Sequence, residues 1–130
     1  MTSKKKLLIV DDKKVNRYVL SSIFEEKYDI EECSDGVQAI TALSQTQDEM
    51  AAILLDIVMP ECNGFEVLEY MRQEGINDIP VILISATRDD EAVKKGFELQ
   101  IADYIQKPFE DEIVQKRVEY IIEQFEKRRR

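Results

Sequence analysis

Carboxylates, a hydroxyl and an amine stand where four apolar segments of this chain end. These residues are Asp11, Asp12, Asp56, Ser85 and Lys107. Three carboxylates within about 4 Å of one another would repel by roughly 4 kcal/mol per pair at an effective dielectric constant of about 20, so a shared site needs a counter-charge. Oxygen donors without histidine or thiolate favour Mg²⁺, with Mn²⁺ as the second choice, and Lys107 offers a further, mobile positive charge.

Each of these residues also has a structural explanation when it is taken alone. Aspartate is common in loops, and either Asp11 or Asp12 could cap the helix that follows it. A solvated acidic turn would account for both aspartates. It would not account for the hydroxyl of Ser85 and the amine of Lys107 at two other segment ends, so the joint placement favours one shared site.

Five short segments have the composition of β-strands and lie between helical patterns. Four are rich in Ile, Leu and Val, as expected for strands buried on both faces, and one alternates apolar and acidic residues like an edge strand. In chain order the five cover residues 7–10, 28–33 (the edge strand), 51–55, 81–84 and 101–105. Four helices are indicated by apolar stripes, which are Val15, Val19 and Ile23; Val37, Ile40 and Leu43; Phe65, Leu68 and Met71; and Val114, Val118, Ile121 and Phe125.

A further helix is predicted over residues 88–99, although it has fewer apolar residues. Strands alternating with helices predict an α/β fold, with a doubly wound, five-stranded parallel sheet and helices on both faces. The ligand site of such a sheet lies at the carboxyl ends of its strands. The sequence therefore brings the five polar residues to one edge.

Two helix starts and one helix end can be predicted from local sequence. Asp35 stands three residues before Gln38, and Asn63 stands three before Glu66, which is the spacing of a capping pair. Gln100 follows the predicted helix over residues 88–99, so we expect that helix to end without a glycine cap.

Composition excludes several classes of protein. The length of 130 residues suits one domain, and 18 basic against 27 acidic residues argue against direct binding to nucleic acid. The absence of histidine excludes Ser/His/Asp hydrolysis, histidine-ligated metals and a histidine phosphocarrier. Cys33 and Cys62 are far apart, and no segment is long enough for a signal peptide or a membrane span, so we expect a reduced, cytoplasmic protein without membrane contact.

Four strings of residues resemble the signature of the response regulator receiver family of two-component signal transduction, the CheY-like superfamily. They are Ile9-Val10-Asp11-Asp12, Asp56-Ile57-Val58-Met59-Pro60 followed by Asn63-Gly64, Ile84-Ser85-Ala86, and Asp103-Tyr104-Ile105-Gln106-Lys107-Pro108-Phe109. They occur in the family's order over nearly the whole chain. The resemblance implies a flavodoxin-like (βα)₅ fold and a single receiver domain over residues 1–130.

The resemblance also implies the roles of the site residues. Asp56 would be the phosphoacceptor, and Asp11, Asp12, Asp56 and the backbone carbonyl of Val58 would bind Mg²⁺. The donor would be a sensor histidine kinase or a histidine phosphotransfer protein. The chain would be a signalling phosphoacceptor and no enzyme beyond Mg²⁺-dependent self-phosphorylation and self-dephosphorylation.

The resemblance also implies which residues bind the phosphoryl oxygens and which one acts as a conformational switch. Ser85 and Lys107 would bind the phosphoryl oxygens, and Tyr104 would be the aromatic switch residue. The peptide bond between Lys107 and Pro108 is expected to be cis.

Three alternatives remain beside this interpretation. A haloacid dehalogenase-type hydrolase needs a second aspartate two residues after the nucleophile, where this chain has Val58. A flavodoxin-like binding protein needs small hydroxyl and glycine residues in the first loop, which here reads Asp11-Asp12-Lys13-Lys14. A degenerate receiver that serves only as a protein-docking module would not need all of the site residues that this chain has.

The C-terminal helix is predicted to extend beyond the sheet. From residue 110 to 130 it would be about 30 Å long, against about 17–20 Å for a typical strand. Its stripe at Val114, Val118, Ile121 and Phe125 has heptad-like spacing, and Ile121, Ile122 and Phe125 are hard to bury against the sheet. We therefore expect a linker toward a C-terminal output domain and a weak homodimer that phosphorylation strengthens.

Overall fold

Five parallel strands form a single sheet in the order β2-β1-β3-β4-β5 in this computed structural model, which describes residues 4–58 and 63–128. The strands are β1 (Lys6–Val10), β2 (Asp29–Cys33), β3 (Met50–Leu55), β4 (Val81–Ser85) and β5 (Asp103–Gln106). The predicted doubly wound fold is confirmed, with β2 as an edge strand. Met59, Pro60 and Cys62 of the sequence predictions lie outside the described residues.

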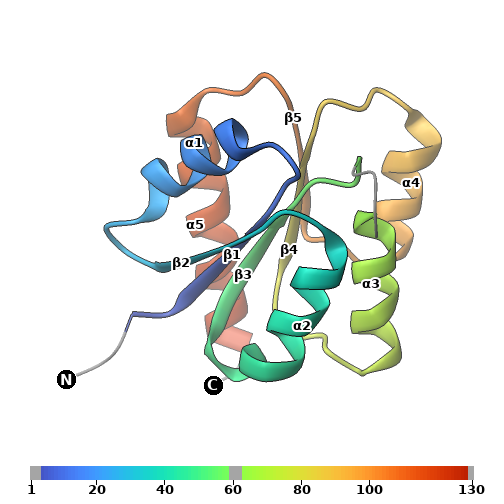
Figure 1. Ribbon diagram of the computed structural model, residues 1–130, viewed down its shortest axis with the longest axis horizontal. Coiled ribbons are helices and arrows are strands. Elements are labelled where there is room, and N and C mark those ends of the chain that lie inside the picture. The colour runs from blue at the N-terminus through green and yellow to red at the C-terminus, as the bar shows by residue number, and fades with distance from the viewer. Residues whose placement is uncertain (1–3, 59–62, 129–130) are drawn as a thin grey trace.

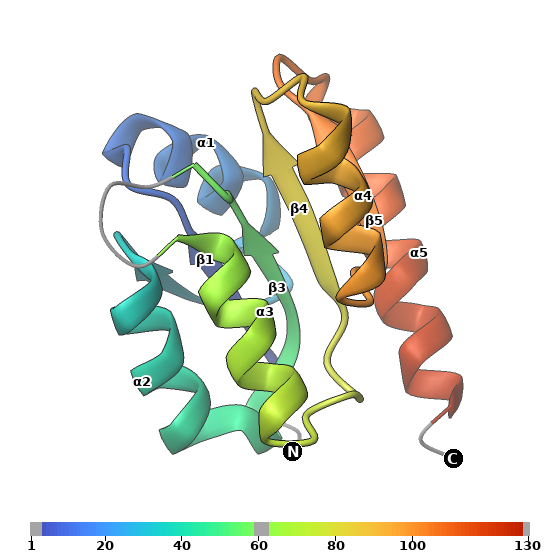
Figure 2. The same cartoon turned by 90° about the vertical axis from the view of Figure 1, so that its right-hand side faces the viewer.

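The helices cover both faces of the sheet (Figures 1 and 2). On one face lie α1 (Lys14–Phe24) and α5 (Asp111–Arg128), and on the other lie α2 (Gly36–Thr46), α3 (Gly64–Gln73) and α4 (Asp90–Glu98). A short 3₁₀ helix, η1 (Gln47–Glu49), leads into β3. None of the helices in the described part of the chain has the length and apolar character needed to cross a membrane.

The continuous apolar runs in the sequence reflect burial on two sides. Leu8 and Val10 of β1 pack with α2 and α3, whereas Leu7 and Ile9 pack with α1 and α5. Because successive side chains of a strand point to opposite faces, a strand with a helix layer on each side needs apolar residues at every position. All residues of β3 and β4 are buried in this way.

The predicted apolar stripe of α1 is wrong at its first position. The buried residues of this helix are Leu20 and Phe24, and Val15 is 66% exposed. Val15 stands in the first turn, near the carboxyl edge of the sheet, where it lines a surface pocket and does not contact the core. The helix is amphipathic as predicted, but its buried face begins later.

The end of α4 is formed without glycine. Gln100 has a φ of 70°, the left-handed conformation that glycine adopts most easily, and its backbone N–H donates to the Phe97 carbonyl. Ile101 then donates to the Gly96 carbonyl and is buried in the core. The predicted strand 101–105 is therefore wrong at its start, because residues 101 and 102 complete the turn and β5 begins at Asp103.

The C-terminal helix packs on the sheet for longer than predicted. Ile122 is 7% exposed and belongs to the core together with Val114 and Val118, so the expectation that it is hard to bury is wrong. The reason is that the amino ends of β1 and β3 contribute Leu7 and Ala51 to the same cluster and extend the apolar surface under α5. Ile121 packs against this cluster from its edge.

Candidate functional site

The carboxyl edge of the sheet brings two buried aspartates together around one lysine. The Lys107 Nζ lies 2.8 Å from Asp11 Oδ2 and 3.1 Å from Asp56 Oδ2. Asp11 follows β1, Asp56 follows the adjacent β3, and Lys107 follows β5. Buried charges require a counter-charge, and here the ammonium supplies it to both carboxylates.

Backbone amides hold both carboxylates in place. The Val58 N–H donates to Asp56 Oδ1, and the Lys13 N–H donates to Asp11 Oδ1, each at 2.9 Å. Asp56 is also anchored by its own N–H, which donates to the Val10 carbonyl at 2.9 Å. Each buried aspartate therefore has one oxygen on a backbone amide and the other on the lysine.

Gly64 allows the start of α3 to pack directly against the backbone of the site. A Cβ at this position would lie 2.8 Å from the Asp56 carbonyl oxygen and from Ile57 Cα. The preceding Asn63 caps α3, accepting hydrogen bonds from the N–H groups of Phe65 and Glu66. The predicted capping role of Asn63 is confirmed, and Asp35 likewise accepts from the Gln38 N–H.

Lys107 is held in its charged form by the aspartates. Burial alone would lower the pKa of its ammonium group, but the hydrogen bond to Asp11 and the charges of Asp56 and Asp11 outweigh burial and raise the pKa above its ordinary value. The Lys107–Pro108 peptide bond is cis. The amine is thus a permanent positive charge at neutral pH.

A pocket of about 980 Å³ opens at this edge, and several predicted site residues line it. Its walls include Asp12, Asp56, Val58, Ser85 and Lys107. Asp12 is exposed, Val58 is 61% exposed, and Ser85 is fully buried. Asp11 is 2% exposed and does not line the pocket, so Asp56 is the buried carboxylate that an incoming group can reach.

Thr87 joins Ser85 to Tyr104, and the sequence analysis did not single it out. The Thr87 N–H donates to Ser85 Oγ at 3.3 Å, and the Tyr104 hydroxyl donates to the Thr87 carbonyl. Gln106 Nε2 donates to the same carbonyl at 3.4 Å. Burial, partly offset by Arg88, raises the pKa of Tyr104, so the hydroxyl remains a donor. One sequence signal was available for Thr87, which is that it follows Ser85 by two residues.

The donor set suits a hard divalent cation. The pocket edge offers carboxylate oxygens and the Val58 backbone, and Mg²⁺ prefers oxygen ligands and retains several waters. Within residues 4–58 and 63–128, no group of three or more acidic, histidine or cysteine side chains is arranged so that it could hold a metal ion. The reason is visible in the contacts, since Lys107 occupies the space between Asp11 and Asp56 and Asp12 is turned to solvent.

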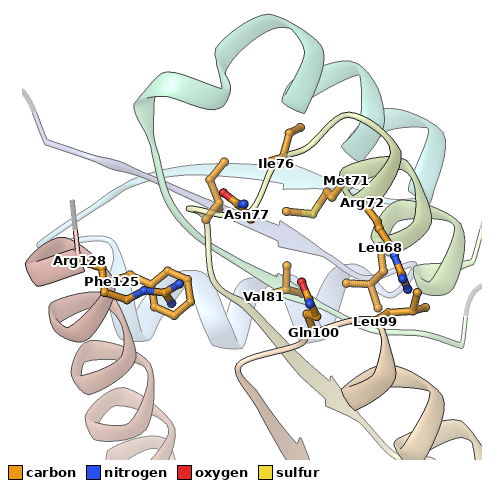
Figure 3. A pocket seen from close by; sticks show the side chains of 11 residues that line it. Leu68, Met71, Arg72, Ile76, Asn77, Val81, Leu99, Gln100, Phe125 and Arg128 are labelled. Atoms are coloured by element: carbon orange, nitrogen blue, oxygen red, sulfur yellow. The ribbon is translucent and has the colours of Figure 1, made fainter.

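A second pocket, of about 400 Å³, lies at the opposite, amino edge of the sheet (Figure 3). Its walls are apolar side chains such as Met71 and Val81, with Arg72 and Arg128 on opposite sides. Both arginines stand in the last turn of a helix, where a positive charge complements the helix dipole. No acidic side chain lines this pocket in the described residues, so it is not the site of the predicted chemistry.

Comparison with known proteins agrees with this geometry. A family model described as the response regulator receiver domain matches residues 7–119. The chain belongs to this family. The chain is 34% identical to the regulatory protein VanRB of Enterococcus faecalis over 116 residues. The aligned region covers 89% of this chain and 51% of VanRB.

Solved structures of receiver domains are similar over almost the whole chain. The BeF3-activated receiver domain of DrrB, a Thermotoga maritima OmpR/PhoB homologue, has a TM-score of 0.79 and 30% identity, covering 93% of this chain and 99% of that one. A chain of the CheX–CheY–BeF3–Mg²⁺ complex from Borrelia burgdorferi has a TM-score of 0.82 and 28% identity, covering 90% and 88%.

The family assigns the general function. The chain is a receiver domain of the kind found in two-component response regulators, a family for which phosphorylation chemistry is expected. Receiver domains bind Mg²⁺ in general and usually precede an output domain. This chain spans about half the length of the curated regulators it matches first.

Proposed function

We propose that Asp56 is the residue that takes the phosphoryl group, with a sensor histidine kinase or a histidine phosphotransfer protein as donor. The observation that carries this assignment is the difference between the two buried aspartates. Asp56 lines the open pocket, whereas Asp11 does not line it and contacts Lys107. Asp56 also follows the central strand β3, between β1 and β4, so Asp11 and Ser85 flank it.

The transfer needs little from the protein beyond position and charge. A carboxylate attacks phosphorus without a general base, forming a bond from an Asp56 oxygen to phosphorus while the bond to the donor nitrogen breaks. Lys107 donates to both aspartates and has a third N–H available. In the proposed reaction it donates to a phosphoryl oxygen, and the Ser85 hydroxyl donates to another.

The residues that would hold Mg²⁺, or Mn²⁺ in its place, are Asp11, Asp12, Asp56 and the backbone carbonyl of Val58. When bound, the ion supplies positive charge beside the phosphoryl oxygens. Asp11 and Asp56 are held by backbone amides and need only exchange their contact with Lys107. The exposed Asp12 completes the set from the pocket side.

The contacts of Thr87 support a switch from Ser85 to Tyr104. When Ser85 Oγ turns to a phosphoryl oxygen, the Thr87 N–H loses its acceptor. The Thr87 carbonyl accepts hydrogen bonds from Tyr104 and Gln106, which belong to β5. Movement of Thr87 would therefore shift the side chains of these two residues. We propose that the altered surface comprises α4, β5 and α5.

The partners of the complete regulator follow from the same proposal. We propose that it acts in the cytoplasm, that an output domain follows α5, and that phosphorylation strengthens a homodimer through α5 and its neighbours. The chain itself would turn over no substrate beyond taking up and losing its own phosphoryl group. Light scattering with and without beryllium fluoride tests the dimer, which a strict monomer in both states would rule out.

Acetyl phosphate with MgCl₂, followed by intact mass, tests the acceptor. The wild type should gain one phosphoryl group, Asp56→Asn none, and Ser85→Ala a reduced amount. Asp35→Asn is a matched control, because asparagine can retain the cap of α2. Labelling that persists in Asp56→Asn would assign the acceptor to another residue, and an unlabelled wild type would favour a receiver that only docks.

A further inference from the structure

Arg17 of α1 joins the ends of two strands beside the site. Its Nη1 donates to the Asp11 backbone carbonyl at 2.8 Å, and its Nε donates to Glu32 Oε1 at 3.0 Å. The side chain is only 15% exposed. Arg17 therefore holds the backbone at the point where β1 ends and uses the carboxyl end of β2 as its support.

The acceptor of this hydrogen bond belongs to the peptide that connects Asp11 and Asp12. A peptide unit is planar, so the Asp11 carbonyl and the Asp12 N–H move together. The preceding peptide is already fixed, because the Asp11 N–H donates to the Cys33 carbonyl at 3.1 Å. Arg17 thus fixes the orientation of the peptide on the amino side of Asp12, and the Lys13 N–H on its carboxyl side donates to Asp11 Oδ1.

Asp12 depends on this support more than the other acidic residues of the site. The carboxylates of Asp11 and Asp56 are each held by a backbone amide and by Lys107. The Asp12 carboxylate is exposed and makes no hydrogen bond or ion pair with the rest of the described chain. Its direction is set by its backbone alone.

We propose that Arg17 is a positioning residue that directs Asp12 toward the divalent cation. The proposal rests on the metal-binding role of Asp12 given above. Outer residues that orient the ligands of a metal commonly change its affinity by about 10- to 100-fold when they are replaced. The cost here should be near the lower end, about 10-fold, because only one ligand is affected.

The charge of Arg17 and its positioning role should change the affinity for Mg²⁺ in opposite directions. A guanidinium beside the site repels a cation, so removing it should tighten Mg²⁺ binding if charge were its only contribution. A positioning role predicts weaker binding. The sign of the change therefore separates the two effects.

Calorimetric titration of the full chain with MgCl₂ measures the binding directly. Arg17→Ala should bind Mg²⁺ about 10-fold more weakly than the wild type, and Arg17→Lys should also bind more weakly although its charge is unchanged. Arg72→Ala is the matched control, because Arg72 lies at the opposite edge of the sheet and pairs with no acid among the described residues. Its affinity should equal that of the wild type.

Melting curves recorded with and without MgCl₂ separate positioning from a general loss of stability. A purely structural role would lower the melting temperature of Arg17→Ala equally in both conditions, whereas the proposal requires a smaller Mg²⁺-dependent rise. Unchanged or tighter Mg²⁺ binding by Arg17→Ala and Arg17→Lys would overturn the positioning role and leave the proposed function intact. A wild type that binds no Mg²⁺ would overturn the proposed metal ligands themselves.

Discussion

Replacing Lys107 with methionine should destabilise the protein in the absence of metal. The ammonium is the charge that two buried carboxylates share, and methionine keeps an unbranched apolar chain but removes that charge. The side chains of Asp11 and Asp56 are 3% and 10% exposed, so water can take over only part of the role of the amine. Methionine would therefore leave the two buried carboxylates without the counter-charge that they share.

The contact distances set the size of the effect. Since Lys107 Nζ lies 2.8 Å from Asp11 Oδ2 and 3.1 Å from Asp56 Oδ2, these oxygens are at most about 5.9 Å apart, the sum of the two distances. At that separation two negative charges repel by about 2.8 kcal/mol at an effective dielectric constant of about 20. Removing one partner of a buried ion pair typically costs about 3–5 kcal/mol. We expect a loss of about 3 kcal/mol, or roughly 10 °C in melting temperature.

Urea unfolding followed by circular dichroism in EDTA measures this loss. Lys116→Met is the control, because Lys116 and its partner Glu112 are both more than 70% exposed and their pair should contribute less than about 0.5 kcal/mol. MgCl₂ should restore more stability to Lys107→Met than to the wild type, since the cation can replace the missing charge. Equal stability of Lys107→Met and Lys116→Met in EDTA at pH 7 would refute the shared counter-charge.

Four other predictions concern single properties of the domain. Because the pKa of Lys107 is raised, its contribution to the free energy of unfolding should be complete below about pH 10.4 and lost only as the pH rises further, as urea titrations from pH 7 to 11 would show. Val58 is apolar and cannot orient water, so the acyl phosphate should hydrolyse slowly, and Val58→Asn or Val58→Glu should shorten its lifetime in a phosphate-release assay. Beryllium fluoride should shift backbone NMR signals of α4, β5 and α5; shifts confined to the pocket edge would contradict the switch through Tyr104. A Cβ at Gly96 would lie 2.9 Å from Leu83 Cδ1, so Gly96→Ala should lower the free energy of unfolding, measured in urea, by about 1–2 kcal/mol. An unchanged free energy of unfolding would show that the Leu83 side chain moves aside.

Local patterns were sufficient for the fold and for the edge at which the site lies. Apolar runs, helical stripes and capping residues such as Asn63 depend on neighbours in the chain, and their physical causes are local. The alternation of strands and helices then leaves few topologies, because parallel strands require right-handed crossovers. The residues that follow β1, β3 and β5 consequently had to meet at one edge.

Tertiary contacts decided what the sequence by itself could not. Asp11 and Asp12 are identical and adjacent, yet one is buried against Lys107 and the other faces solvent, because successive residues at a strand end point to different sides. The burial of Ile122 depended on how far the apolar face of the sheet reaches under α5. The contacts of Arg17 and Thr87 join segments that no periodicity relates, so their place beside the site is determined only when the chain is folded.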